Sequence, residues 1–139
     1  MSTKKTLILT VGLPRSGKTT WAKAQGCPIV NPDSIRWALY GQRYFLGGEK
    51  HVWAIARTMV EALFLAGNGV VILDATSITL KRRMDWIGSW EIATKTIDTP
   101  ADVCIQRALI NDDTEIVPVI ERMAEEYEPV EAWELQKDG

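Results

Sequence analysis

The chain has little of what metal centres and disulfide frameworks are built from. Its 139 residues include one histidine, His51, and two cysteines, Cys27 and Cys104, far apart in the sequence. A single histidine argues against a histidine-based metal site and against a histidine general base. Two distant cysteines without metal-ligand spacing predict reduced thiols, as in a cytosolic protein.

Long apolar runs, internal repeats and an excess of one charge are missing as well. No apolar stretch is long enough to span a membrane, and residues 1–5 lead directly into a predicted strand. We therefore expect a cytoplasmic protein with no signal peptide and no membrane partner. The net charge of −2 provides no basic surface for non-specific nucleic-acid binding. The length predicts one domain over residues 1–139, ending in an acidic, solvated tail from about 128 to 139.

Strand and helix patterns alternate along the chain, as a parallel sheet requires. Apolar runs predict buried strands at 6–11 and 70–73, and shorter patterns predict strands at 28–30 and 92–97. One helix is expected from Thr20 onward, and another is expected to run to Tyr40 with Asn31 as its N-cap. Further helices are predicted at 49–66, 80–87, 101–110 and 117–127. The fold class is therefore α/β.

Between the first strand and the first helix lies the stretch Gly12-Leu13-Pro14-Arg15-Ser16-Gly17-Lys18-Thr19, followed by Thr20. It matches the pattern G-x-x-x-x-G-K-[ST], whose glycines let backbone N–H groups and a helix N-terminus surround an anion. In this pattern Lys18 reaches the β and γ phosphates of a nucleotide, and the Thr19 hydroxyl holds Mg²⁺. An accidental glycine-rich turn is the weaker interpretation, because the strand–loop–helix context also fits. The sequence predicts nucleoside triphosphate binding by residues 12–20.

Asp33 and Arg36 are candidates for catalysis. They lie three residues apart at the start of a predicted helix and therefore share one of its faces. Ligand crevices of open parallel sheets lie outside the carboxyl ends of the strands, so Asp33 should stand near the phosphate loop. Its carboxylate could accept the proton of an attacking hydroxyl group. The alternative is a first-turn acid that is favoured by the helix dipole and paired with Arg36.

Two further groups could carry chemistry. Asp74 closes the 70–73 strand, where an acid in a phosphate-loop protein reaches Mg²⁺ directly or through water; otherwise it starts a turn. Lys81, Arg82 and Arg83 form a basic cluster. This cluster could hold an acceptor phosphate, since arginine suits bidentate phosphate contacts, or it could be the exposed side of an amphipathic helix.

Together these segments resemble the phage-type polynucleotide 5′-hydroxyl kinases and their small phosphate-loop kinase relatives. Residues 9–22 look like the family's opening, and residues 31–36 are similar to its N-x-D-x-x-R segment. Residues 73–76 resemble its strand-end D-x-T, with Arg82, Arg83 and Trp86 downstream as in its R-R-x-x-W. The order continues with residues 98–100, a helix carrying Arg107, and Val117-Pro118, so the resemblance covers residues 5–128.

The resemblance implies a kinase-type P-loop NTPase fold, a three-layer sandwich around a four-stranded parallel sheet of order 2-3-1-4, with a small helical lid. It implies ATP and Mg²⁺ as cofactors, with the metal held by Thr19 and Asp74. It also implies Asp33 as general base, and charge neutralisation by Lys18 and Arg107 on the transferring group. The acceptor-binding residues would be Asp33, Arg36, Thr76, Arg82 and Arg83.

One segment departs from the family pattern. The second lid arginine falls on Asn111, and the following Asp112 and Asp113 make the lid acidic, which would oppose a polyanion. The favoured function is transfer of the γ-phosphoryl group of ATP to a hydroxyl of a nucleic acid, in a bacterial or phage-infected cytosol. The alternatives are a kinase of a hydroxymethylated DNA base or of a small nucleoside or sugar, and a nucleotide switch without an acceptor. The sequence leaves open the nucleotide base and the oligomeric state.

Overall fold

Four parallel strands form the sheet of this protein. The computed structural model describes residues 4–131 and Glu134, and places the strands in the order β2-β3-β1-β4. They are β1 (Thr6–Val11), β2 (Ile29–Val30), β3 (Val70–Leu73) and β4 (Glu91–Thr96). Central β1 pairs with β3 on one side and with β4 on the other. The predicted four-stranded parallel sheet and its strand order are confirmed.

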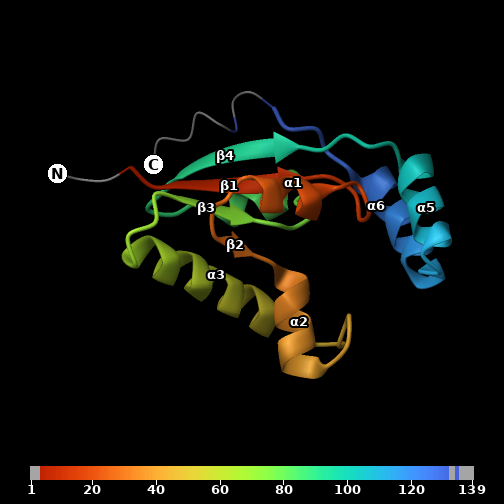
Figure 1. Cartoon of the computed structure of the whole chain (residues 1–139), viewed down its shortest axis with the longest axis horizontal. Helices are drawn as coiled ribbons and strands as arrows, with labels where there is room; N and C mark the ends of the chain where they lie inside the picture. Colours follow the sequence, from red (N-terminus) through yellow and green to blue (C-terminus); the bar gives the residue numbers. More distant parts are fainter. Residues whose placement is uncertain (1–3, 132–133, 135–139) are drawn as a thin grey trace.

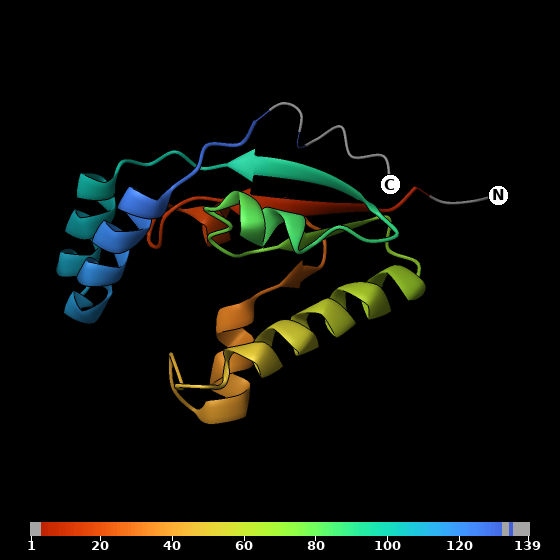
Figure 2. The same ribbon diagram turned by 180° about the vertical axis from the view of Figure 1, so that it is seen from behind.

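Helices flank this sheet and extend past one end of it. They are α1 (Lys18–Ala24), α2 (Pro32–Tyr40), α3 (Glu49–Leu65), α4 (Leu80–Met84), α5 (Ala101–Ile110), a 3₁₀ turn (Thr114–Ile116) and α6 (Val117–Glu126). Helices α1 and α4 lie on opposite faces of the sheet, as the two opposite views show (Figure 1, Figure 2). Helices α5 and α6 project beyond the carboxyl ends of the strands (Figure 1). None of the helices in the described ranges is long and apolar enough to cross a membrane.

The main core lies between the sheet and α3. Val52, Ala56, Val60 and Phe64 recur every fourth residue, so they form one buried stripe along this helix. The stripe packs with the buried side chains of β1 and β3, among them Leu7, Leu9, Val71 and Leu73. A separate cluster of Cys104, Ala108 and Ile120 holds α5 against α6. We call α5, the 3₁₀ turn and α6 the lid.

The start of α2 follows the predicted capping. The Asn31 side chain accepts a hydrogen bond from the Asp33 backbone N–H at 2.8 Å, and Pro32 is the first helical residue. Gly41 ends the helix in a left-handed conformation, with a φ of 64°. These local signals fix the first turn of α2, and with it the position of Asp33.

Apart from strand and helix ends that shift by one residue, three predictions about secondary structure differ from the structure. Helix α1 already begins at Lys18, so the lysine and threonine of the phosphate loop belong to its first turn. Val70 is 37% exposed instead of buried, because it is the first residue of β3. The helix predicted at 80–87 ends at Met84, and the chain then turns so that Trp86 enters the main core.

Arg83 has a structural role, and its predicted acceptor role is wrong. Its side chain is 3% exposed and forms an ion pair with Glu134, with Nε and Oε2 2.8 Å apart. It also donates to the backbone carbonyls of Ser77 at 2.8 Å and Glu128 at 2.9 Å. Glu134, expected in a solvated tail, is therefore buried, and Arg83 fastens the C-terminal segment to the body. Residues 132–133 and 135–139 of the predicted tail lie outside the described residues.

Replacing Arg83 should weaken folding. Because Arg83→Met leaves the buried Glu134 carboxylate without its counter-charge, we expect the free energy of unfolding to fall by about 3–5 kcal/mol. Urea titration measures this change. Arg82→Met is the matched control, since the neighbouring side chain is exposed and its loss should cost less than about 0.5 kcal/mol. Equal stability of the two variants would contradict the structural role of Arg83.

Candidate active site

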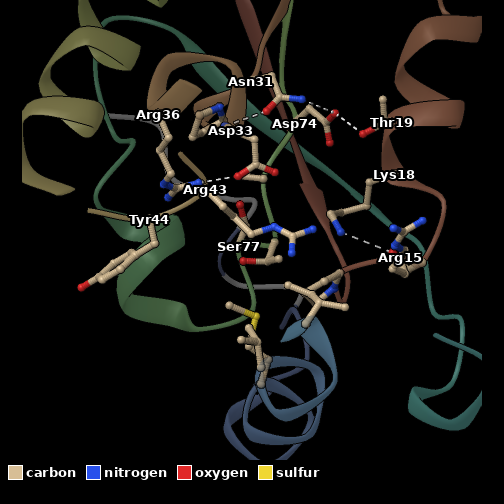
Figure 3. Close-up of a pocket in the computed structure, with 18 of the residues that line it drawn as sticks. Arg15, Lys18, Thr19, Asn31, Asp33, Arg36, Arg43, Tyr44, Asp74 and Ser77 are labelled. Atoms are coloured by element: carbon tan, nitrogen blue, oxygen red, sulfur yellow. Dashed lines mark hydrogen bonds and ion pairs between the residues drawn. The ribbon is translucent and has the colours of Figure 1, made fainter. Parts of the chain in front are cut away.

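A crevice opens at the carboxyl ends of the strands, where ligands of open parallel sheets bind. Its walls come from the phosphate loop, the start of α2, the α2–α3 loop, the β3–α4 loop and the lid. Figure 3 shows Lys18 and Thr19 on one side of this space and Asp33 and Arg36 across from them. The predicted donor-side and acceptor-side residues therefore face one another in a single crevice.

The phosphate loop has a backbone that requires glycine. A Cβ atom on Gly12 would lie 2.7 Å from the carbonyl oxygen of Ile97, so a larger residue would displace the loop. Gly17 has a φ of 109°, a value that side chains disfavour. The carbonyl of Ser16 accepts hydrogen bonds from Thr99 at 2.8 Å and from Arg107 at 3.1 Å. These contacts tie the loop to α5 and the residues before it.

Lys18 is the buried cation of the loop. Its ammonium group donates to the carbonyl of Leu13 at 2.6 Å and contacts the Ser16 hydroxyl at 3.4 Å. Burial lowers the pKa of Lys18 to about 8, and the nearby Asp74 carboxylate offsets part of that effect. A nucleotide phosphate would favour the charged form of this lysine, so phosphate binding and protonation of Lys18 are coupled.

Thr19 and Asp74 come together as predicted for a Mg²⁺ site. The Thr19 hydroxyl donates to Oδ2 of Asp74 at 2.7 Å, and the Asn31 amide donates to the same oxygen at 3.3 Å. Mg²⁺ prefers hard oxygen ligands and binds through one or two carboxylates together with substrate phosphates and water. A buried carboxylate beside a hydroxyl at the start of α1 fits this ion.

Asp33 and Arg36 form the predicted pair, and a third residue fixes it. Nη1 of Arg36 donates to Oδ1 of Asp33 at 2.6 Å. Arg36 also donates to both carboxylate oxygens of Glu49, at 2.9 and 2.7 Å. Hydrogen bonding to Glu49 raises the pKa of Arg36, and the same contact lowers the pKa of Glu49. Asp33 remains 71% exposed, so its carboxylate can be reached by a substrate.

Arg82 and Thr76 line the same crevice, whereas Arg83 does not. The guanidinium of Arg82 lies 5.2 Å from the centre of the Trp53 ring, and that of Arg36 lies 5.8 Å from it. Such cation–π contacts hold both arginines close to one indole. The predicted acceptor side is thus assembled around Trp53, without Arg83.

The lid reaches the phosphate loop through charged side chains. Arg107 donates to the carbonyls of Arg15 and Ser16, both at 3.1 Å. Asp113 of the acidic lid segment pairs with Arg15 at 3.0 Å and with Arg43 of the α2–α3 loop at 2.7 Å. Hydrogen bonds from Arg43 and Arg15 lower the pKa of Asp113 to about 2. Asp113 is therefore neutralised by two arginines.

Comparison with known proteins agrees with this architecture. The family model described as an AAA domain (AAA_33) matches residues 7–129. The chain belongs to this AAA-domain family. Among solved structures, a chain of a Pnkp1/Rnl/Hen1 complex is 26% identical, with a TM-score of 0.68 over 77% of this chain and 40% of that one. A gluconokinase from Sinorhizobium meliloti is 17% identical, with a TM-score of 0.57 over 92% and 78%.

This AAA-domain protein therefore has a kinase-type P-loop fold, and the expected resemblance to phosphate-loop kinases is confirmed. The chain spans 40% of the length of the chain it matches in the Pnkp1/Rnl/Hen1 complex. Glu49 and Arg43 are the crevice residues that sequence reasoning missed. Their partners lie 13 and 70 residues away, so no local pattern marks them.

Because the pKa of Lys18 is lowered to about 8, we expect nucleotide binding to take up protons in alkaline solution. At about pH 8.5 less than half of free Lys18 is charged, whereas bound phosphate would hold the proton. ATP affinity should therefore fall as the pH rises through about 8. Calorimetric titrations of ATP in two buffers with different ionisation enthalpies measure the proton uptake. Lys18→Met should bind ATP weakly and without this uptake; the same uptake in the variant would assign it to another group.

Proposed function

We propose that this protein transfers the γ-phosphoryl group of ATP to a hydroxyl group of a nucleic acid. The observation that carries the proposal is the placement of the Asp33–Arg36 pair across one crevice from Lys18 and Thr19 (Figure 3). A switch protein needs the phosphate loop alone. An exposed carboxylate, oriented by an arginine and facing that loop, suits transfer to an acceptor.

On the donor side, the residues of the loop bind and orient the triphosphate. Lys18 would turn from the carbonyl of Leu13 to the β and γ phosphate oxygens. Thr19 and Asp74 would hold Mg²⁺, which supplies positive charge beside the phosphates. Arg107 is already fixed to the loop carbonyls, so it adds positive charge without further ordering.

On the acceptor side, Asp33 accepts the proton of the hydroxyl group as its oxygen attacks the γ-phosphorus. The new oxygen–phosphorus bond forms while the bond between the γ-phosphorus and the bridging oxygen breaks, so ADP leaves with the bridging electron pair. Arg36 fixes the orientation of the Asp33 carboxylate, and Glu49 in turn fixes Arg36. The base is therefore positioned before substrate arrives.

Aromatic and cationic side chains near Asp33 support a nucleic-acid acceptor. Trp37 lies one helical turn after Asp33, and both Trp37 and Tyr44 line the crevice while 57% exposed. Exposed aromatic rings on which bases can stack are typical of single-strand binding, at about 1–3 kcal/mol per base. Arg36 and Arg82 line the same crevice and suit phosphate contacts. The similarity to a chain of the Pnkp1/Rnl/Hen1 complex points in the same direction.

Removing the base should slow transfer without weakening nucleotide binding. Asp33→Asn keeps the shape of the side chain but cannot take a proton, so we expect kcat to fall by roughly 10²–10⁴-fold. The dissociation constant for ATP should change little. Asp85→Asn is a matched control, because Asp85 also lines the crevice but lies on the α4 side. Normal transfer by Asp33→Asn, together with a lower melting temperature, would leave Asp33 only a helix-stabilising role.

The acceptor is tested by offering γ-labelled ATP with 5′-hydroxyl oligonucleotides, with DNA carrying hydroxymethyluracil, and with free nucleosides. We expect the oligonucleotide to be preferred. Arg82→Ala should raise its KM uniformly across base sequences, because phosphate contacts position a strand without reading it. Arg36→Ala should do the same and should also lower kcat, because Arg36 orients Asp33. Each lost contact should also lower the log–log salt slope by about 0.7–0.9. Equal or better use of the free nucleoside would reject the nucleic-acid acceptor and leave a small-molecule kinase.

A further inference from the structure

Arg43 reaches from the α2–α3 loop across the crevice. Figure 3 shows its side chain pointing into the space between Asp33 and Lys18. Its two terminal nitrogens donate to the two oxygens of Asp113, at 2.8 and 2.7 Å. Arg15 of the phosphate loop donates to the same carboxylate at 3.0 Å. Two guanidinium groups therefore converge on one anion inside the crevice.

This arrangement is the geometry of an oxyanion site that is filled by a side chain of the protein itself. Asp113 is only 9% exposed, while Arg15 and Arg43 remain 34% and 42% exposed. A guanidinium binds carboxylate and phosphate oxygens through the same fork of N–H groups. A phosphoryl group carries more charge than a carboxylate, so it can compete with Asp113 for these donors.

The charges around the phosphate loop indicate which anion would come. Lys18 supplies one positive charge to a bound triphosphate, and Arg107 is already bound to carbonyls of the phosphate loop. Within the described residues, all hydrogen bonds of the Arg43 guanidinium go to carboxylates of the lid segment. None of them goes to the phosphate loop or to α2. Arg43 can therefore turn to a phosphoryl group between Lys18 and Asp33 without breaking the fold.

We propose that Arg43 is a further catalytic residue, which leaves Asp113 when ATP binds and donates to the γ-phosphoryl group. It stays protonated throughout: no proton leaves it while the bond to the acceptor oxygen forms and the bond to the bridging oxygen breaks. Its N–H groups bind the equatorial oxygens, on which charge is concentrated during transfer. Before the nucleotide arrives, Asp113 occupies the donors of this guanidinium. The inference rests on the proposed phosphoryl transfer from ATP, but on no particular acceptor.

The competing explanation is a latch, in which Arg43 only ties the α2–α3 loop to the lid. The two explanations differ in what Asp113 does. A latch needs both partners, so Arg43→Ala and Asp113→Asn would have the same effect. A phosphate-binding arginine makes Asp113 a competitor, so Asp113→Asn would leave triphosphate binding unchanged or make it tighter.

The test compares the binding of ADP with that of the β,γ-imido analogue of ATP, in the presence of Mg²⁺, by calorimetry. For Arg43→Ala we expect the analogue to bind about 10-fold more weakly or worse, whereas the affinity for ADP stays within about twofold, because ADP lacks the γ group. The kcat of this variant should fall by roughly 10²–10³-fold. Arg43→Lys should recover part of the affinity for the analogue and part of kcat, because lysine restores the positive charge but not the forked N–H donors of the guanidinium.

Asp113→Asn and Glu115→Gln complete the design. Glu115 also accepts from Arg43, at 2.7 Å, but it is 73% exposed, so Glu115→Gln is a control with little expected effect. Equal weakening of ADP and the analogue in Arg43→Ala, or loss of analogue binding in Asp113→Asn, would overturn the proposal. Melting temperatures show whether Arg43→Ala is misfolded. If it is, the comparison of ADP with the analogue in Arg43→Lys decides the test. These binding experiments contain no acceptor, so they separate a failure of this inference from a failure of the nucleic-acid assignment.

Discussion

The buried carboxylate of Asp74 connects the two halves of the site. Its Oδ2 accepts a hydrogen bond from Thr19 at the start of α1 and another from the Asn31 amide. Asn31 uses its other side-chain atom to cap α2 at the Asp33 backbone N–H. A single chain of hydrogen bonds therefore runs from the proposed metal ligand to the proposed base. Because Asp74 also ends β3, between β1 and β2, the sheet itself sets the spacing between donor and acceptor.

Paired charges dominate the rest of the crevice. Arg36 is bound to Glu49, and Arg43 is bound to Asp113, so part of the positive charge of a crevice rich in arginine is neutralised before substrate arrives. Such pairs order long side chains that would otherwise lose conformational freedom on binding. Substrate binding is weakened in turn, because a phosphate must replace a carboxylate at a guanidinium or share the guanidinium with it. Selectivity for strongly charged ligands follows from this competition.

The sequence predicts those features that depend on neighbouring residues. The bounds of β1 and α5, the cap at Asn31 and the phosphate loop follow from apolar runs, capping residues and a spacing motif, and the structure agrees with them. The prediction is wrong for Arg83, whose partner Glu134 lies 51 residues away, and local patterns gave no signal for Glu49 or Arg43. A charged residue looks the same in sequence whether it faces solvent, substrate or a distant counter-ion. Only the packing of the chain distinguishes these cases.

The small core of the lid has a kinetic consequence. Among the hydrophobic residues that the structure describes as packed against Cys104, Ala108 and Ile120, only Leu13 comes from outside residues 101–120. The lid is therefore joined to the body chiefly by ion pairs and by the hydrogen bonds of Arg107. Salt screens partly exposed pairs much more than it weakens an apolar interface. Opening of the lid should therefore accelerate with ionic strength, and release of the ADP that the proposed phosphoryl transfer forms would accelerate with it.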